Sequence, residues 1–189
     1  MAAWDVIESV TEYETGWYTG GYDLVEQPDG SRKRYYWARL PPAVVVVAVD
    51  DGEVVFVRQY RPVVKEECLE LVAGIVDPGD GRGDAPPGTA PDAAYEAAAV
   101  RELEEETGYV AGETRVLETF WVATGVLRHE RGVVYATDLD AGGDRLTDSN
   151  EFLEPVRRDP ASVLGPDAAL PGNDATLEGL LLAERADLL

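Results

Sequence analysis

Cysteine, lysine and long apolar runs are scarce in this chain of 189 residues. Cys68 is the only cysteine, so no internal disulfide can form, and the sequence favours a reducing compartment. No apolar run approaches the roughly 20 residues that a membrane-spanning helix needs. The first residues lack the basic stretch and apolar stretch of a signal peptide, so we expect a cytoplasmic protein with no membrane partner.

Positive charge is scarce as well. The chain has 16 basic and 37 acidic residues, a net charge of −21, and only Lys33 and Lys65 are lysine. Such an acidic surface repels nucleic acid, so we expect no nucleic acid partner. Acidic excess with little lysine is typical of proteins from salt-loving organisms, where concentrated salt screens self-repulsion. We therefore hypothesise a halophilic host; full stability in dilute buffer with precipitation in molar KCl would contradict it.

The sequence predicts an α+β fold in which strands come first. Residues 17–26 and 32–40 alternate in the manner of strands and flank a turn at 27–31, which predicts a hairpin of an antiparallel sheet. The valine-rich run at 43–49 predicts a strand that is buried on both faces. Further strands are expected at 53–58, 69–72, 114–122, 133–138 and 153–157, and an amphipathic helix at 173–189. Two parts follow, an N-terminal antiparallel sheet at 1–41 and a second part at 42–189.

The most informative segment is residues 101–109, with the sequence RELEEETGY. A helix is expected to begin near Thr89 as its N-cap and to stop at Gly108. On its wheel, Val100, Leu103 and Thr107 share the side expected to pack on the sheet. Glu102, Glu105 and Glu106 stand at i, i+3 and i+4 on another side, where like charges repel unless a cation neutralises them.

Oxygen ligands that converge in this way suit Mg²⁺ or Mn²⁺, hard ions that usually also hold a substrate phosphate. The segment thus predicts a metal-assisted hydrolase of a phosphate compound. Arg101 lies one turn before Glu105, and its expected role is to orient a glutamate.

The residues around this helix resemble the Nudix hydrolase family. Its box reads glycine, five residues, glutamate, seven residues, then Arg-Glu-apolar-x-Glu-Glu-x-Gly-apolar, and residues 101–109 match the second half at seven specified positions. In the first half Gly74 is present, but Asp80 replaces the glutamate. Twenty residues separate Asp80 from Arg101, which indicates an insertion within 81–92, at a loop that tolerates length.

Segments 57–62 (VRQYRP) and 69–74 (LELVAG) are similar to the ADP-ribose pyrophosphatase branch of the family. The resemblance implies a Nudix fold, with a mixed sheet between helices and an N-terminal sheet that reaches a partner in a homodimer. It also implies that the carbonyl of Ala73 joins the metal ligands. A general base is expected from the loop after the next strand, where Glu130 is the candidate and His129, the sole histidine, is its rival.

Three further polar residues are predicted at the substrate. Arg58 and Arg61 carry planar guanidinium groups that suit bidentate phosphate binding, and they match substrate-binding positions of the branch; Arg61 is favoured, because Arg58 fits a structural salt bridge equally well. Glu70 lies within a strand, where an unpaired carboxylate would be costly, so it either supports the site or contacts the substrate.

The resemblance favours hydrolysis of ADP-ribose to AMP and ribose 5-phosphate. Two alternatives stay open at this stage. One is a hydrolase of another nucleoside diphosphate sugar, and the other is a non-catalytic Nudix-like domain that binds a nucleotide or a protein. Loss of a ligand glutamate would favour the non-catalytic reading, and none is lost here.

Overall fold

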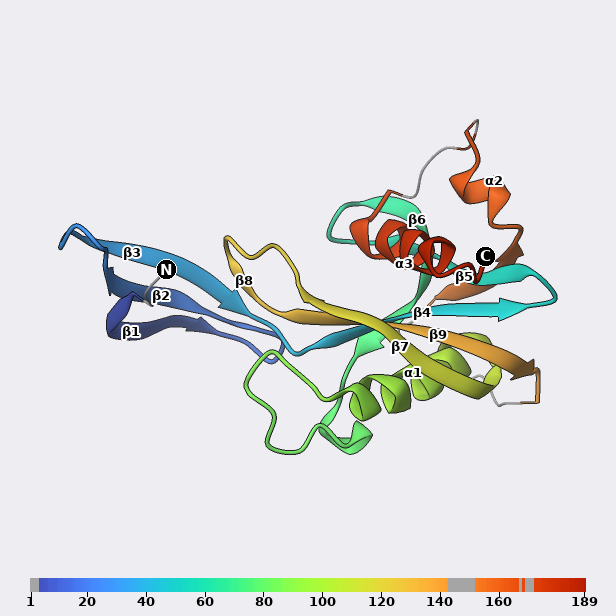
Figure 1. Ribbon diagram of the computed structural model, residues 1–189, viewed down its shortest axis with the longest axis horizontal. Coiled ribbons are helices and arrows are strands. Elements are labelled where there is room, and N and C mark those ends of the chain that lie inside the picture. The colour runs from blue at the N-terminus through green and yellow to red at the C-terminus, as the bar shows by residue number, and fades with distance from the viewer. Residues whose placement is uncertain (1–3, 143–151, 167, 169–171) are drawn as a thin grey trace.

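The computed structural model describes residues 4–142, 152–166, 168 and 172–189 (Figure 1). Its fold is α+β, with two sheets and few helices. The strands are β1 (Asp5–Glu14), β2 (Thr19–Glu26), β3 (Arg32–Arg39), β4 (Ala43–Asp50), β5 (Glu53–Arg61), β6 (Glu66–Ile75), β7 (Val110–Trp121), β8 (Leu127–Arg128), β9 (Glu130–Asp140) and β10 (Leu153–Arg158). The helices are the 3₁₀ turn η1 (Pro78–Asp80), α1 (Asp92–Thr107), α2 (Ala161–Leu164) and α3 (Asp174–Arg185).

The N-terminal sheet has the order β1-β2-β3-β8 and extends away from the body of the molecule, at the left of Figure 1. The predicted hairpin is confirmed as β2 and β3, which pair antiparallel from Thr19↔Arg39 to Glu26↔Arg32. Strand β1 was not predicted, because its side chains are exposed at almost every position and give no alternating signal. Short β8 pairs parallel with β3, so a segment from far along the chain completes this sheet.

The second sheet has six strands in the order β10-β5-β6-β4-β9-β7. Its central strand β4 is buried on both faces, as the valine run predicts: Val44 and Val46 lie in the core under α1, and Val45 and Val47 lie in the core under α3. Figure 1 shows the two helices on opposite sides of this sheet. The sheet therefore packs against α1 on one face and against α3 on the other.

Helix α1 begins at Asp92 and ends at Thr107, and the Gly108 that follows takes the left-handed conformation with φ 78°. Pro91 precedes it at the N-cap position, so the expected cap at Thr89 is wrong; the Thr89 hydroxyl donates instead to the Pro86 carbonyl over 2.8 Å. The buried side of the helix carries mainly small residues together with Tyr95, whose ring lies against Gly132. A Cβ at Gly132 would stand 2.5 Å from Tyr95 Cδ1, so only glycine admits this ring.

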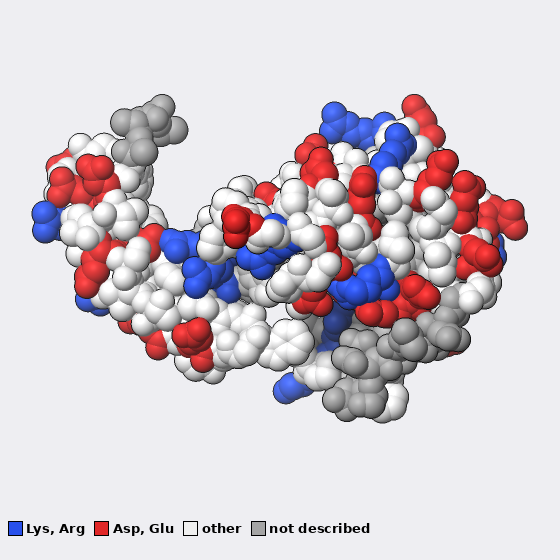
Figure 2. Space-filling view, turned by 90° about the horizontal axis from the view of Figure 1, so that it is seen from below, with Lys and Arg blue, Asp and Glu red and all other residues white. Residues whose placement is uncertain are grey.

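Acidic side chains form scattered patches over the face shown in Figure 2, and basic ones gather between the N-terminal sheet and the body. Among the described residues, no helix has the length and apolar character that crossing a membrane would require.

Candidate active site

A cavity of about 480 Å³ opens where α1 faces the ends of β5 and β6. The residues that line it include Ala73, Arg61, Arg101, Glu102, Glu105 and Glu106. Since Glu102, Glu105 and Glu106 come from one face of α1, and Ala73 from the neighbouring strand β6, the structure brings together the residues that the sequence predicts as ligands.

Arg101 is the centre of the hydrogen bonds beside this cavity. It donates to Glu102 Oε1 over 2.8 Å and to Glu105 Oε2 over 3.0 Å, so it holds two of the three glutamates. It also donates to the Ile75 carbonyl over 2.9 Å. These contacts agree with its expected role of orienting a glutamate.

Asp80 lies directly on the other side of the same guanidinium. Its two carboxylate oxygens accept from Arg101 Nε over 3.1 Å and Nη2 over 3.0 Å. The hydrogen bonds that Arg101 donates to Asp80, together with the charge of Glu102, raise the pKa of Arg101 above its ordinary value. The loop between Asp80 and α1 therefore bulges outward without separating Asp80 from the helix, and Asp80 helps to fix Arg101.

Gly74 lets Glu102 approach the end of β6. A Cβ at position 74 would stand 1.9 Å from Glu102 Oε1, a space that the carboxylate fills. Only the missing side chain of Gly74 allows Glu102 to lie so near the strand that carries the Ala73 carbonyl.

The donors in this cavity fit a hard divalent cation, because they are carboxylate and carbonyl oxygens gathered within one hollow. In the described part of the chain, however, no three acidic, histidine or cysteine side chains already surround a common point. Arg101 bridges Glu102 and Glu105 instead. To bind an ion, these carboxylates would have to move toward one another and give up their present contacts with Arg101.

Arg61 reaches the cavity from β5 and is held by Glu70. Its Nε lies 2.7 Å from Glu70 Oε2, which also accepts from Gln59 Nε2 over 2.9 Å. Asn173, just before α3, donates to Glu70 Oε1 over 3.2 Å. Buried Glu70 is thus satisfied on both oxygens and supports the position of Arg61. The contact of Asn173 with Glu70 was not predicted, because it joins residues 103 positions apart.

Arg58 does not line this cavity. Side chains alternate along a strand, so Arg58 and Arg61 point to opposite faces of β5. Arg58 pairs with Glu154 over 2.9 Å and with Glu67 over 3.7 Å. The structure therefore favours the salt-bridge reading of Arg58 that the sequence left open.

Residues 39–178 match the family model described as the NUDIX domain. The chain belongs to the Nudix family. It is 32% identical over 132 residues to the ADP-ribose pyrophosphatase of Bacillus subtilis (strain 168), which covers 69% of this chain and 64% of that protein. It is 34% identical over 104 residues to the methanol dehydrogenase activator of Bacillus methanolicus, covering 54% of this chain and 49% of the relative. The chain thus spans about half to two thirds of the length of these relatives.

A solved structure described as an ADP compounds hydrolase has the same fold as this Nudix chain. It superposes with a TM-score of 0.79 at 23% identity, over 98% of this chain and 95% of that one. The Nudix fold predicted from the sequence, with its additional N-terminal sheet, is confirmed.

Glu130 lies at the start of β9 and is not among the residues that line the cavity of this Nudix domain. It accepts a hydrogen bond from the buried Tyr95 hydroxyl over 2.8 Å. Burial, and then this carboxylate, raise the pKa of Tyr95, so the hydroxyl stays protonated and keeps donating. The structure therefore gives Glu130 a packing role and does not bring it to the glutamates of α1.

We expect Glu130→Gln to change turnover little, because the glutamine oxygen still accepts from Tyr95. Tyr95→Phe is the matched variant, and it should lower the thermal midpoint because it removes the donor. Turnover on a nucleoside diphosphate sugar and thermal unfolding check both variants. A large loss of turnover in Glu130→Gln, with an unchanged thermal midpoint, would contradict this expectation and support Glu130 as the general base.

His129, the rival base, is also held away from the cavity. The residue is 8% exposed, and Nδ1 lies 2.6 Å from the Pro41 carbonyl, which can only accept and so fixes the proton on that nitrogen. Burial lowers the pKa of His129 below its ordinary value of 6.5. The imidazole is therefore neutral and serves to hold β9 against the chain at Pro41.

This lowered pKa makes the stability of the protein depend on pH. The unfolded chain binds a proton at His129 more readily than the native chain, so the free energy of unfolding should fall as pH drops below the ordinary histidine value. Between about pH 7.5 and about pH 5.5 we expect the wild type to lose more stability than His129→Gln. Urea unfolding at several pH values measures this difference, and parallel curves for the two proteins would contradict it.

Proposed function

We propose that this chain hydrolyses the diphosphate bond of ADP-ribose to give AMP and ribose 5-phosphate. The observation that carries the proposal is the cavity in which Glu102, Glu105 and Glu106 meet Arg61 and the end of β6. The kinship with a protein named ADP-ribose pyrophosphatase supports the choice of substrate.

We propose Mg²⁺, with Mn²⁺ as a substitute, as the cofactor of this reaction. Glu102, Glu105, Glu106 and the Ala73 carbonyl would hold it. When bound, such an ion neutralises phosphate charge and lowers the pKa of a water ligand, the two things that hydrolysis of a diphosphate needs.

Side chains of the cavity would bind the substrate and position the glutamates. Arg61, kept in place by Glu70, binds a phosphate oxygen of the substrate with its planar guanidinium. Arg101 keeps two glutamates on the cavity side of α1, and Asp80 fixes Arg101 in turn. Water attacks one phosphorus, the bridging oxygen leaves with the other, and two phosphate monoesters result.

The test is to incubate the protein with ADP-ribose and Mg²⁺ and to quantify AMP and ribose 5-phosphate by chromatography. A panel of nucleoside diphosphate sugars, assayed at low and high salt, ranks the substrates and also addresses the halophile hypothesis. Equal amounts of the two products, lost on chelation, are expected. A folded protein that releases no AMP from ADP-ribose would overturn the choice of substrate.

We also propose that the chain forms a homodimer through its N-terminal sheet. Large apolar side chains stand exposed there, including Val6 and Tyr36 at 56% and Trp17 at 76%. Such exposure on a protruding sheet is typical of an interaction surface. Light scattering should give twice 20.5 kDa, and Val6→Lys should lower it toward 20.5 kDa. A monomer at all concentrations would exclude the dimer.

A further inference from the structure

A second, smaller hollow lies between the N-terminal sheet and the loop that precedes α1. Its volume is about 220 Å³, and three segments line it: the β1–β2 loop at 15–19, the end of β3 with the following residues at 39–41, and parts of the long loop at 82–88. Trp17 borders both this hollow and the cavity of the glutamates. The volume is below the roughly 300–1,000 Å³ of sites that enclose a drug-sized molecule, so it suits a single chemical group.

The charge of this hollow is opposite to that of the protein. Arg39 and Arg82 line it, and no Asp or Glu is among the described residues that do so, although 37 of the 189 residues are acidic. Arginines beside the neighbouring cavity and sheet contact carboxylates, such as Arg101 with Asp80 and Arg128 with Asp23. For Arg39 the described residues provide only the ring of Trp37, 5.9 Å away, and no carboxylate partner. Two arginines that line the same hollow with no described carboxylate beside them indicate a place for an anion from outside.

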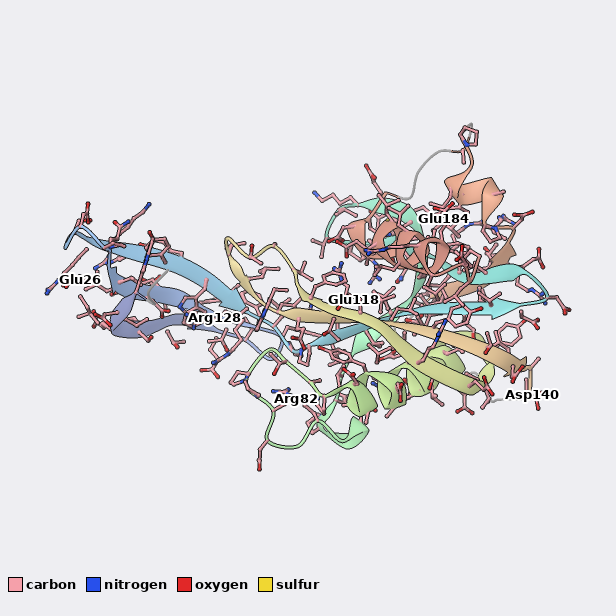
Figure 3. All side chains as sticks on the ribbon, in the orientation of Figure 1. Glu26, Arg82, Glu118, Arg128, Asp140 and Glu184 are labelled. Carbon is pink, nitrogen blue, oxygen red and sulfur yellow. The ribbon has the colours of Figure 1, made fainter. Side chains whose placement is uncertain are left out.

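Arg82 supplies a second observation. Its Nε is buried and has no hydrogen-bond partner among the described residues. A buried donor without a partner is unfavourable, and an acceptor oxygen that reached it would remove this cost. Figure 3 places Arg82 on the loop below the sheets, within the stretch that lengthens the Nudix box in this chain. The lengthened loop thus brings a cation to the hollow.

We propose that Arg39 and Arg82 form an anion subsite that binds a phosphate monoester group. A guanidinium offers its donors in a planar fork that matches phosphate oxygens, and two of them would neutralise a dianion. The phosphate has two possible sources, free inorganic phosphate or an additional phosphate carried by a nucleotide whose diphosphate occupies the neighbouring cavity. The second source rests on the proposed function, whereas binding of phosphate does not.

Calorimetric titration with inorganic phosphate in the presence of EDTA tests the subsite without any metal or turnover. The wild type should bind phosphate, and Arg39→Gln and Arg82→Gln should each weaken binding by roughly tenfold or more. Arg185→Gln removes the same charge from an exposed position on α3 and should leave binding unchanged. Absence of phosphate binding to the wild type, or equal effects of Arg82→Gln and Arg185→Gln, would overturn the proposal. Thermal midpoints of all variants verify that they fold.

Kinetics with ADP-ribose and its 2′-phosphate then identify the source of the phosphate. If the wild type has the higher kcat/KM for the phosphorylated compound, and Arg82→Gln removes that preference but not the hydrolysis of ADP-ribose, the subsite binds a group of the substrate. Equal kcat/KM values in the wild type, together with calorimetric binding that depends on Arg82, assign the subsite to free phosphate. Because calorimetry needs no turnover, failure of the subsite is distinguishable from failure of the proposed reaction.

Discussion

Glu105→Gln should lower kcat for ADP-ribose on the order of 10³-fold, because a neutral amide replaces one of three carboxylates that are proposed to hold the divalent ion. Ions in such sites contribute several kcal/mol to the transition state, which corresponds to a loss of this size. Glu105 is partly exposed, with 36% of its side chain accessible, so the substitution should not unfold α1. Initial rates of AMP release with Mg²⁺ in excess measure the effect.

Glu104→Gln is the matched control for this prediction. It makes the same chemical change on the same helix, one residue away, at a position that does not line the cavity. We expect its kcat to equal that of the wild type. Equal kcat values for Glu104→Gln and Glu105→Gln would mean that activity depends on the overall charge of α1 and not on Glu105 as a ligand. The assignment of the metal site would then fail.

Gly74→Ala should lower kcat/KM about 100-fold, a loss that a displacement of roughly 1 Å in an active site can cause. The added Cβ would lie 1.9 Å from Glu102 Oε1 and 2.0 Å from its carboxyl carbon, so the carboxylate must move. This movement also disturbs the 2.8 Å hydrogen bond from Arg101. The thermal midpoint should change little, since the clash involves the free end of a side chain.

Gly125→Ala is the control, because a Cβ there meets nothing within 4 Å. Its kcat/KM should match that of the wild type. Gly74→Ala with full activity would show that Glu102 does not need its place beside the end of β6, and its assignment as a ligand would have to be abandoned.

The sequence predicted the strands of the second sheet because their periodicity is strong. The valine-rich run at β4 reflects burial on both faces of the strand directly. Strand β1 was not predicted because it is exposed along most of its length, so its sequence does not alternate between apolar and polar residues. The start of α1 was misplaced for a local reason. The Thr89 hydroxyl donates to the Pro86 carbonyl and does not cap the helix, so Pro91 occupies the N-cap position.

The core side of α1 was predicted only in part. Leu103 is buried as expected, but the rest of the buried face consists of Ala94, Tyr95, Ala98 and Ala99. Hydrophobicity alone favours large residues for the core, whereas here small residues let the helix approach the sheet and Gly132 makes room for Tyr95. Such complementarity depends on both surfaces and is not readable from one segment.

The sequence placed Glu102, Glu105 and Glu106 on one face of α1 because they lie within one helical turn of one another, and their role as ligands stays a prediction. The supporting contacts were not, since Asp80 reaches Arg101 across 21 positions and Asn173 reaches Glu70 across 103. The position of Glu130 depended on the path of the chain from β7 to β9, which turns it toward Tyr95. Site residues that lie close together in the sequence can be found from it. Contacts between residues that are far apart in the sequence depend on the fold and cannot.

Calorimetric titration of the protein with Mg²⁺ in the presence of a non-hydrolysable ADP-ribose analogue tests the central claim most directly. The account predicts saturable uptake by the wild type and much weaker uptake by Glu105→Gln, with Glu104→Gln unchanged. Absence of Mg²⁺ and Mn²⁺ uptake by the folded wild type, with or without the analogue, would contradict it.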